Sequence, residues 1–443
     1  MTRSKSYLFA IIDGGGTVPA DTSVIRALVQ RGHDVRVLAD RVLAPDVERT
    51  GAEHVVWNRA PQRANLDPLS MIVNDYDAKT PFEAFARIRD GVIVGPADRF
   101  AADVRDELLR RPADVVVGNF FVFGAQIAAQ AEGVPFAFLV SNLLSFKGSG
   151  TPPLGPGLKP ARGPLGRARD AALNRVMTRL FDKGLDDLNE TRRANGLAPV
   201  GSVLECFELA DRLLLMTSRA FEYESFSPPP NVRIVGPRLD DPAWAGEWTP
   251  PAGDDPLVLV GMSSTFMDHA DVLRRATTAL GKLPVRGLVT TGPAVSPESI
   301  EAPPNVTVVE RAPHSEVLRH TAAVVTHAGH GTVIKALAAG VPVVAIPLGR
   351  DQLDNAARVA HHGAGVRLKP KASAEAIARS VRRVLEEPAF AQGAGRLADA
   401  IAAECAEDQA VTELELLGSK EPAVQPGVPY GDAKLHSAAS SVP

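Results

Sequence analysis

The chain alternates short apolar runs with amphipathic stretches. Residues 7–13 (YLFAIID) form an apolar run that ends in a carboxylate. Residues 22–32 then repeat apolar side chains at helical spacing and end at a glycine, and a second apolar run follows at 34–40. This order predicts a strand, a helix and a parallel strand. The same rhythm continues through residues 114–120, 134–140, 211–216 and 231–237.

A second α/β unit follows an interruption. Residues 239–256 (LDDPAWAGEWTPPAGDDP) have no periodicity and are rich in Pro, Asp and Gly, which is typical of a linker. We therefore predict an α/β protein with two Rossmann-like, doubly wound domains, residues 1–238 and 257–400, that face an interdomain cleft. Ligands of such sheets bind beyond the carboxyl ends of the strands, so the cleft is the expected site. The strands restart at residues 257–266 and continue at 284–292, 305–310, 322–329 and 341–347.

Three segments stand outside this rhythm. Residues 142–165 are dense in Gly and Pro and are expected to cover or line a pocket. Residues 401–417 are predicted to form a C-terminal helix that can pack back on the first domain. Residues 418–443 have the composition of a disordered tail.

Composition excludes several classes of partner. The 443 residues include 48 Lys and Arg against 52 Asp and Glu, so no basic excess indicates nucleic acid or an anionic membrane. Cys206 and Cys405 form no CxxC pair, which excludes a disulfide framework and fits a reducing cytoplasm. No apolar run approaches the ~20 residues of a membrane span. The expectation is a cytoplasmic monomer or homodimer.

The strongest chemical signal is an anion site in the second half. A buried strand ends at His327, the turn HAGHGT follows, and a helix begins near Thr332. Backbone N–H groups at Gly331 and Thr332, the helix dipole and the imidazole all favour negative charge there. A second strand ends in the hydroxyl-rich loop GMSSTF. Together the two loops suit a diphosphate, the second loop contributing Ser263, Ser264 and Thr265.

Each part of this signal has a simpler interpretation. His327 and His330 form HxxH, which can ligate a metal, but no carboxylate stands at the spacing of HExxH, so no metal site is predicted. Ser263, Ser264 and Thr265 can instead cap a helix. The order of the pieces along the chain favours the diphosphate interpretation.

Residues 311–359 (RAPHSEVLRHTAAVVTHAGHGTVIKALAAGVPVVAIPLGRDQLDNAARV) resemble the donor-binding signature of family 1 glycosyltransferases, the UDP-glycosyltransferase superfamily with the GT-B fold. A weaker similarity extends over residues 7–415, and the bacterial natural-product and macrolide enzymes are the most similar group. The resemblance implies an inverting transferase that moves a hexose from a UDP- or dTDP-sugar to a hydroxyl of a hydrophobic small molecule. It also implies no permanently bound cofactor and no metal requirement.

The resemblance assigns donor contacts residue by residue. The family's turn that holds the diphosphate, which begins with a histidine and a glycine and ends with a serine or threonine, falls on His327, Gly329, His330, Gly331 and Thr332. The pair that holds sugar hydroxyls falls on Asp351 and Gln352, which can accept and donate several hydrogen bonds.

The nucleoside contacts depart from the family pattern. Arg311 stands at the stacking tryptophan and His314 at the glutamine of the base-binding segment, with Ala312 between them. An arginine can still stack on a base. Lys335 stands where a glutamate binds ribose hydroxyls, and a lysine cannot accept those hydrogen bonds. The donor nucleotide therefore stays open between UDP and dTDP.

The catalytic pair also departs. Thr17, in DGGGTVPAD, stands at the family's general-base histidine, and Asn119 stands at the aspartate that orients it. Thr17 cannot act as a base at neutral pH. Asp13 or Asp21 can supply the base instead, with Asp13 the first choice because it ends the strand. Alternatively the acceptor is already acidic, or the protein binds a nucleotide sugar without efficient transfer.

Two rival functions follow from these departures. One is a nucleotide-sugar epimerase on the same fold, and the other is a non-catalytic protein that binds a nucleotide sugar or assists another transferase. The Asp351–Gln352 pair argues against a pure nucleotide binder. Aromatic residues after one predicted strand favour an apolar acceptor pocket, and these are Phe120, Phe121 and Phe123.

Overall fold

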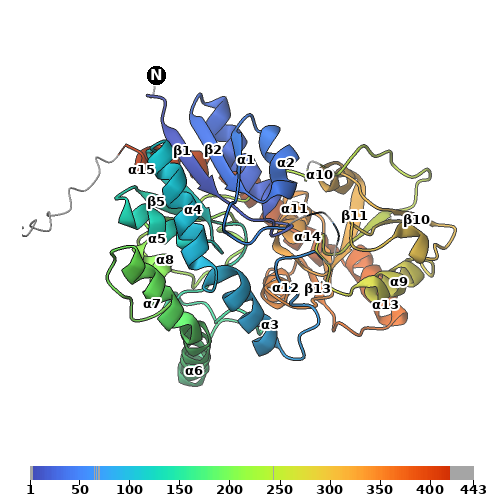
Figure 1. Cartoon of the computed structure of the whole chain (residues 1–443). Coiled ribbons are helices and arrows are strands. Elements are labelled where there is room, and N and C mark those ends of the chain that lie inside the picture. The colour runs from blue at the N-terminus through green and yellow to red at the C-terminus, as the bar shows by residue number, and fades with distance from the viewer. Residues whose placement is uncertain (1–2, 64, 66, 68–69, 243, 420–443) are drawn as a thin grey trace, which may run out of the picture.

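The computed structural model describes residues 3–63, 65, 67, 70–242 and 244–419. It confirms the α/β prediction with two parallel sheets, one in each half of the chain (Figure 1). The predicted tail lies almost entirely outside the described residues. The N-terminal sheet has seven strands in the order β3-β2-β1-β4-β5-β6-β7. Its strands are β1 (Ser6–Ala10), β2 (Asp34–Ala39), β3 (Glu53–Val56), β4 (Val115–Asn119), β5 (Phe136–Val140), β6 (Arg212–Leu215) and β7 (Val232–Ile234).

Helices connect these strands, and the first begins earlier than its apolar pattern predicts. α1 starts at Val18, directly after the glycine turn, because Pro19 in the first helical turn has a fixed φ and needs no N–H partner. The helices of this domain are α1 (Val18–Gln30), α2 (Ala44–Glu48), α3 (Pro81–Ile88), α4 (Ala97–Arg110), α5 (Phe123–Ala131), α6 (Gly163–Phe181), α7 (Leu185–Ala194) and α8 (Glu205–Leu209).

The C-terminal sheet repeats the same winding with six parallel strands in the order β10-β9-β8-β11-β12-β13. Its strands are β8 (Leu257–Gly261), β9 (Arg286–Thr290), β10 (Val306–Val309), β11 (Thr321–Thr326), β12 (Val343–Ala345) and β13 (Gly365–Arg367). Its helices are α9 (Ala270–Leu280), α10 (His314–Val317), α11 (His330–Ala338), α12 (Gln352–His361) and α13 (Ala374–Glu386).

Both sheets are covered on their two faces, which explains why their central strands are apolar without alternation. In β1, residues Tyr7–Ala10 are fully buried, with Leu8 in one apolar cluster and Phe9 in the cluster on the opposite face. The same holds for β8, where Val258 and Leu259 belong to different clusters. The buried strands fix the positions of the loops at their carboxyl ends, and these loops carry the candidate site.

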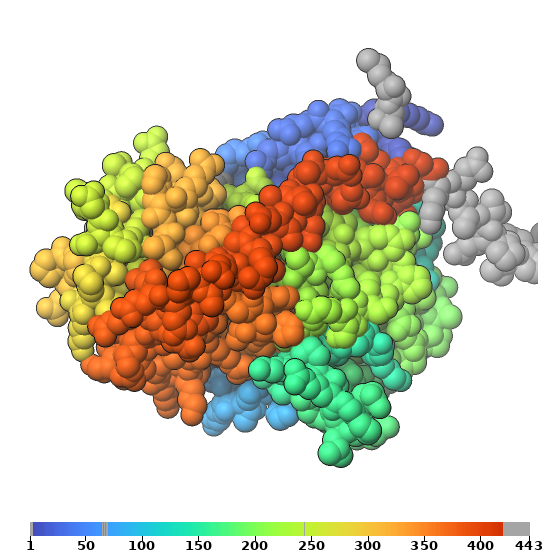
Figure 2. All heavy atoms as spheres, turned by 180° about the vertical axis from the view of Figure 1, so that it is seen from behind, coloured from blue at the N-terminus to red at the C-terminus, as the bar shows by residue number. Residues whose placement is uncertain are grey.

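The C-terminal helices return to the first domain. α14 (Pro388–Glu404) packs on α11, and α15 (Gln409–Leu417) lies against α1. Val411 and Leu414 are buried in the apolar cluster of β1 and α1. The carboxylate of Glu415 on α15 also accepts from Arg31 at 2.9 Å. Figure 2 shows these helices as a continuous red band across both domains. Among the described residues, no helix combines the length and apolar character that a membrane crossing needs.

Candidate functional site

The predicted anion turn lies where β11 passes into α11. Gly329 precedes the helix with extended backbone angles, and His330, Gly331 and Thr332 form its first turn. The N–H groups of that first turn have no partners within the helix, so they are available to an anion. A Cβ on Gly329 would lie 2.4 Å from Nε2 of His327, so only glycine lets the imidazole stand beside the turn. The structure therefore brings these predicted residues together.

The two histidines of the turn are neutral. Burial, with smaller contributions from the charges of His269 and Arg350, lowers the pKa of His327 to about 3. Burial also lowers the pKa of His330, whose Nδ1 lies 3.2 Å from Oδ1 of Asn355. In this state His327 offers an ordinary hydrogen bond to a phosphate rather than the charge-assisted one that the sequence suggests.

The hydroxyl-rich loop after β8 is a self-bonded turn. Oγ of Ser263 lies 2.9 Å from Oγ1 of Thr265 and also accepts from the Thr265 N–H. The loop does not cap a helix, because α9 begins only at Ala270. Ser264 instead points its Oγ toward the N-terminal domain, 3.3 Å from where a Cβ on Gly15 would lie.

The predicted sugar-binding pair stands at the start of α12, and its two members differ. Asp351 is partly exposed and accepts from Nδ2 of Asn355 at 2.8 Å, which holds the carboxylate in place. Gln352 is buried, and its Oε1 accepts from the N–H groups of Leu348 and Gly349 at 2.7 and 3.1 Å. Gln352 therefore shapes the turn before α12, and Asp351 is the more available sugar contact.

An arginine beside this pair was not anticipated from the sequence. Arg350 has a left-handed φ of 54° and makes a bidentate ion pair with Asp75 of the N-terminal domain, at 2.7 and 2.8 Å. Its third contact is a hydrogen bond to Oγ1 of Thr265 at 3.1 Å. A non-glycine residue at this φ costs about 1–2 kcal/mol, and the three hydrogen bonds offset it. Arg350 thus links the donor loops to the facing domain.

Residues of the interdomain linker contact the predicted base-binding segment, residues 311–314. Arg311 lies 5.8 Å from the ring centre of Trp244 and donates to its carbonyl at 3.3 Å. Lys335 forms an ion pair with Asp241 at 2.6 Å, and Asp241 also accepts from the N–H and hydroxyl of Ser315. A carboxylate from the linker thus stands beside the position where the family has its ribose-binding glutamate.

The remaining residues of this segment are buried deeper. Nε2 of His314 lies 3.1 Å from Oγ1 of Thr290, and burial with the charge of Lys335 lowers the pKa of His314 to about 4. Ala312 is buried. The contact between Trp244 and Arg311 and the ion pair between Asp241 and Lys335 have no local sequence signal, because the linker lies far from both partners in the chain.

The glycine turn of the first strand meets the donor loops directly. Gly15 has a φ of 69°, and a Cβ there would lie 2.5 Å from Cγ2 of Thr265. A Cβ on Gly331 would lie 3.9 Å from the carbonyl oxygen of Gly16. Gly15 therefore allows the N-terminal domain to approach the loop after β8 without a side chain in between.

Asp13 is held by an ion pair. Its Oδ2 accepts from Nη1 of Arg63 at 2.7 Å and its Oδ1 accepts from the N–H of Gly15 at 2.9 Å, so both oxygens are engaged. Both side chains of the pair are largely buried. The carboxylate thereby fixes the glycine turn.

Asp21 and Asn119 form a buried pair beside Thr17. Nδ2 of Asn119, at the end of β4, donates to Oδ2 of Asp21 at 2.8 Å. Burial raises the pKa of Asp21 to about 7, although the hydrogen bond from Asn119 opposes this. Within the described part of the chain, Oδ1 of Asp21 and Oγ1 of Thr17 have no hydrogen-bond partner. Asp21 follows Thr17 by four residues, which places both on one side of α1.

Comparison with known proteins agrees with the resemblance in the sequence. Residues 279–417 match the family model described as erythromycin biosynthesis protein CIII-like, C-terminal domain. The 4'-demethylrebeccamycin synthase of Lentzea aerocolonigenes is 34% identical over 431 residues, which cover 92% of this chain and 98% of that protein. The oleandomycin glycosyltransferase of Streptomyces antibioticus is 29% identical, with 91% of each chain covered.

Solved structures support the fold independently. The glycosyltransferase of kitacinnamycin superposes with a TM-score of 0.75 at 21% identity, covering 94% of this chain and 100% of that one. The glycosyltransferase VinC, solved with dTDP, gives a TM-score of 0.66 at 19% identity, with 93% and 99% covered. The chain is thus a glycosyltransferase and belongs to the GT-B natural-product glycosyltransferases of family 1, in the erythromycin CIII-like group.

Proposed function

We propose that this glycosyltransferase transfers a hexose from a nucleoside diphosphate sugar to a hydroxyl of a hydrophobic natural-product-like molecule, with inversion at the anomeric carbon. The observation that carries the proposal is the turn from His327 to Thr332, a helix start with free N–H groups beside a neutral imidazole. The relatives named for antibiotic compounds support the acceptor class.

The donor's diphosphate is proposed to lie at the start of α11. The N–H groups of Gly331 and Thr332 and the imidazole of His327 donate to it, and the positive guanidinium of Arg350 is close enough to affect the pKa of His327. These donors stabilise the negative charge that develops as the bond between the anomeric carbon and the diphosphate oxygen breaks. We infer that this set compensates the charge of the leaving group without a metal, as the family resemblance implies.

The acceptor oxygen attacks the anomeric carbon from the N-terminal side, and its proton must reach a base. Asp13 is the direct candidate, but Arg63 and Gly15 occupy both of its oxygens. Asp21 is the second candidate. Its pKa near 7 matches the pH at which a general base works best, and one of its oxygens is free. In this scheme the acceptor proton passes to the second oxygen of Asp21, and Asn119 orients the carboxylate.

The pH profile separates the two bases. If Asp21 is the base, kcat/KM of the wild type falls about tenfold per pH unit below pH 7, since the protonated carboxyl cannot accept the proton. Asp21→Asn should then lose about 10²–10⁴-fold in rate, the usual contribution of a general base. A loss of that size in Asp13→Asn, with Asp21→Asn near the wild type, would instead assign the role to Asp13.

We propose that the preference for one donor nucleotide is determined by Arg311, Trp244 and the Lys335–Asp241 pair. The arginine and the indole present flat surfaces for a base, and Asp241 provides the carboxylate that a ribose hydroxyl needs. Isothermal titration of UDP and dTDP tests this, because dTDP lacks the ribose 2'-hydroxyl. Asp241→Asn should weaken the binding of UDP more than the binding of dTDP. An equal loss of affinity for both nucleotides would show that Asp241 does not contact the ribose.

Stereochemistry tests the inverting mechanism itself. A β-configured product from an α-linked donor, established by the anomeric coupling in the NMR spectrum, is the expected outcome. Retention would contradict a single in-line displacement. Incubation with donor alone should give no isomer of the donor sugar, whereas an isomer would favour the epimerase alternative.

A further inference from the structure

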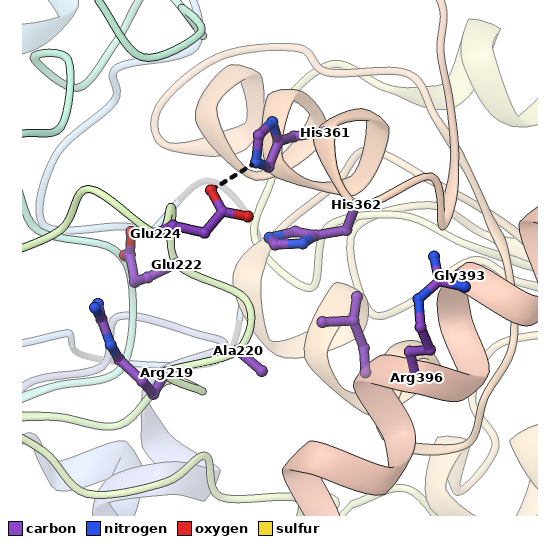
Figure 3. A pocket seen from close by; sticks show the side chains of 9 residues that line it. Arg219, Ala220, Glu222, Glu224, His361, His362, Gly393 and Arg396 are labelled. Carbon is purple, nitrogen blue, oxygen red and sulfur yellow. Dashed lines mark hydrogen bonds and ion pairs between the residues drawn. The ribbon is translucent and has the colours of Figure 1, made fainter.

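A second polar cluster lies at the rear of the domain junction, outside the donor site. A pocket of about 630 Å³ opens between the segment after β6, the end of α12 and α14. Figure 3 shows Glu224, His361 and His362 directed toward the same space. Glu224 comes from the segment between β6 and β7 of the N-terminal sheet, whereas both histidines stand at the end of α12 in the other domain. The cluster therefore joins two elements that lie far apart in the chain.

The three side chains have the geometry of a metal site. One ligand atom from each lies within 4.8 Å of the others. Nε2 of His361 lies 3.2 Å from Oε2 of Glu224. Two imidazole nitrogens and a carboxylate oxygen are a ligand set that Zn²⁺ and related divalent ions use in proteins, with a further position left for water.

The second histidine is held in one tautomer. Nε2 of His362 lies 3.0 Å from the carbonyl oxygen of Phe221. A carbonyl only accepts, so Nε2 carries the proton and Nδ1 keeps its lone pair. A hydrogen bond from a ligating histidine to a backbone carbonyl is the usual support of such a site.

Neighbouring groups orient the first histidine and leave the site accessible. The ring of His361 packs edge-on against Tyr223 at 4.9 Å, and the guanidinium of Arg358 lies 4.4 Å from the centre of the Tyr223 ring. The side chain of Glu224 is 79% exposed, so an ion can enter from solvent. Arg219 and Arg396 line the same pocket, so an anion is expected to accompany the cation and to offset the repulsion from their positive charges.

We propose that Glu224, His361 and His362 bind a divalent transition-metal ion such as Zn²⁺ and thereby tie the two domains together. The site is separate from the donor turn, because the ring of Phe221 lies between His362 and His330, 6.2 and 6.1 Å from them. The ion is structural in this proposal. It fixes the far end of α12, whose other end carries Asp351 and Gln352. This goes beyond the proposed function and does not depend on it.

Metal titration of the tag-free, full-length protein tests the proposal. We expect one equivalent of Zn²⁺ to bind by calorimetry, and Co²⁺ to give the visible absorption of a site with nitrogen ligands. His362→Ala and Glu224→Gln should each weaken binding at least about tenfold. Glu224→Gln is expected to fold as the wild type does, since the replaced side chain is mostly exposed. His320→Ala, a change at an exposed histidine of the same domain, is the matched control and should bind as the wild type does.

Thermal unfolding gives a second readout. Zn²⁺ should raise the Tm of the wild type and of the His320→Ala control, and should raise the Tm of Glu224→Gln less at the same concentration, because a weaker ligand stabilises the folded state less. Equal Zn²⁺ affinity in the wild type and Glu224→Gln would overturn the proposal. So would binding of inorganic phosphate alone to this pocket with no Zn²⁺ or Co²⁺ binding.

Discussion

Replacing Gly15 with alanine adds one methyl group at the point where the two domains meet. The new Cβ would lie 2.5 Å from Cγ2 of Thr265, well inside van der Waals contact. Thr265 cannot simply rotate away, because its hydroxyl bonds to Ser263 and Arg350. Loss of two such hydrogen bonds costs about 2 kcal/mol. This cost destabilises the arrangement seen here, in which the glycine turn of one domain contacts the loop of the other. We therefore expect kcat/KM to fall about 30-fold.

The left-handed φ of Gly15 adds a separate cost to folding. An alanine at a φ of 69° destabilises the fold by about 1 kcal/mol whether or not the domains are closed. Kinetics of sugar transfer and thermal unfolding measured on the same preparation separate the two effects. The unfolding experiment should show a small fall in Tm, and the kinetic loss should exceed what any unfolded fraction explains.

Gly16→Ala is the matched control for this prediction. Its Cβ would meet nothing within 4 Å, and its φ lies outside the left-handed region. It should change kcat/KM by less than about threefold, in keeping with a change that makes no new contact. An equal loss in both variants would show that the turn is merely sensitive to substitution. Activity of Gly15→Ala within threefold of the wild type would refute the claim that this contact forms during turnover.

Three further predictions each state the direction of the expected effect. Asp21→Asn should stabilise the protein increasingly from pH 4 to pH 7, by a few kcal/mol at most. The unfolded wild type releases the proton of Asp21 near pH 4 while the folded wild type holds it up to about pH 7, so the wild type loses stability as the pH rises through this interval; chemical denaturation across the range measures the difference. Arg350→Lys should lower kcat/KM about tenfold, because lysine cannot make the bidentate contact, and Asp75→Asn should add little to that loss in a double-mutant cycle. Lys335→Ala should destabilise folding by about 1–3 kcal/mol by urea denaturation, because the partly buried carboxylate of Asp241 loses its partner.

The donor turn could be predicted because its parts are adjacent in the chain. A buried strand, a glycine turn and a helix start within residues 322–340 define both the local backbone and the direction of its N–H groups. The two-domain α/β fold could be predicted for the same reason, since each strand and helix carries its own pattern. The apolar pattern predicts the start of α1 four residues too late, because the first turn of the helix lacks the apolar repeat, although Pro19 marks it.

The contacts across the domain junction could not be predicted from local patterns. Arg350 and Asp75 are 275 residues apart, and Asp21 and Asn119 are 98 residues apart, so only the packed fold brings each pair together. The protonation states of the buried histidines also depend on contacts between distant parts of the chain. The apolar run before His327 indicates a buried strand, but no local pattern shows that His269 and Arg350 lie close enough to lower the pKa of its imidazole further.

Turnover by the purified protein tests the central claim most directly. The protein would be mixed with UDP-glucose or dTDP-glucose and a panel of macrocyclic and aromatic acceptors, and the products analysed by mass spectrometry. The account predicts an acceptor heavier by one hexose with at least one pairing, strongly reduced in His327→Ala. Binding of both donors without transfer to any acceptor, or conversion of the donor alone to an isomer, would contradict it.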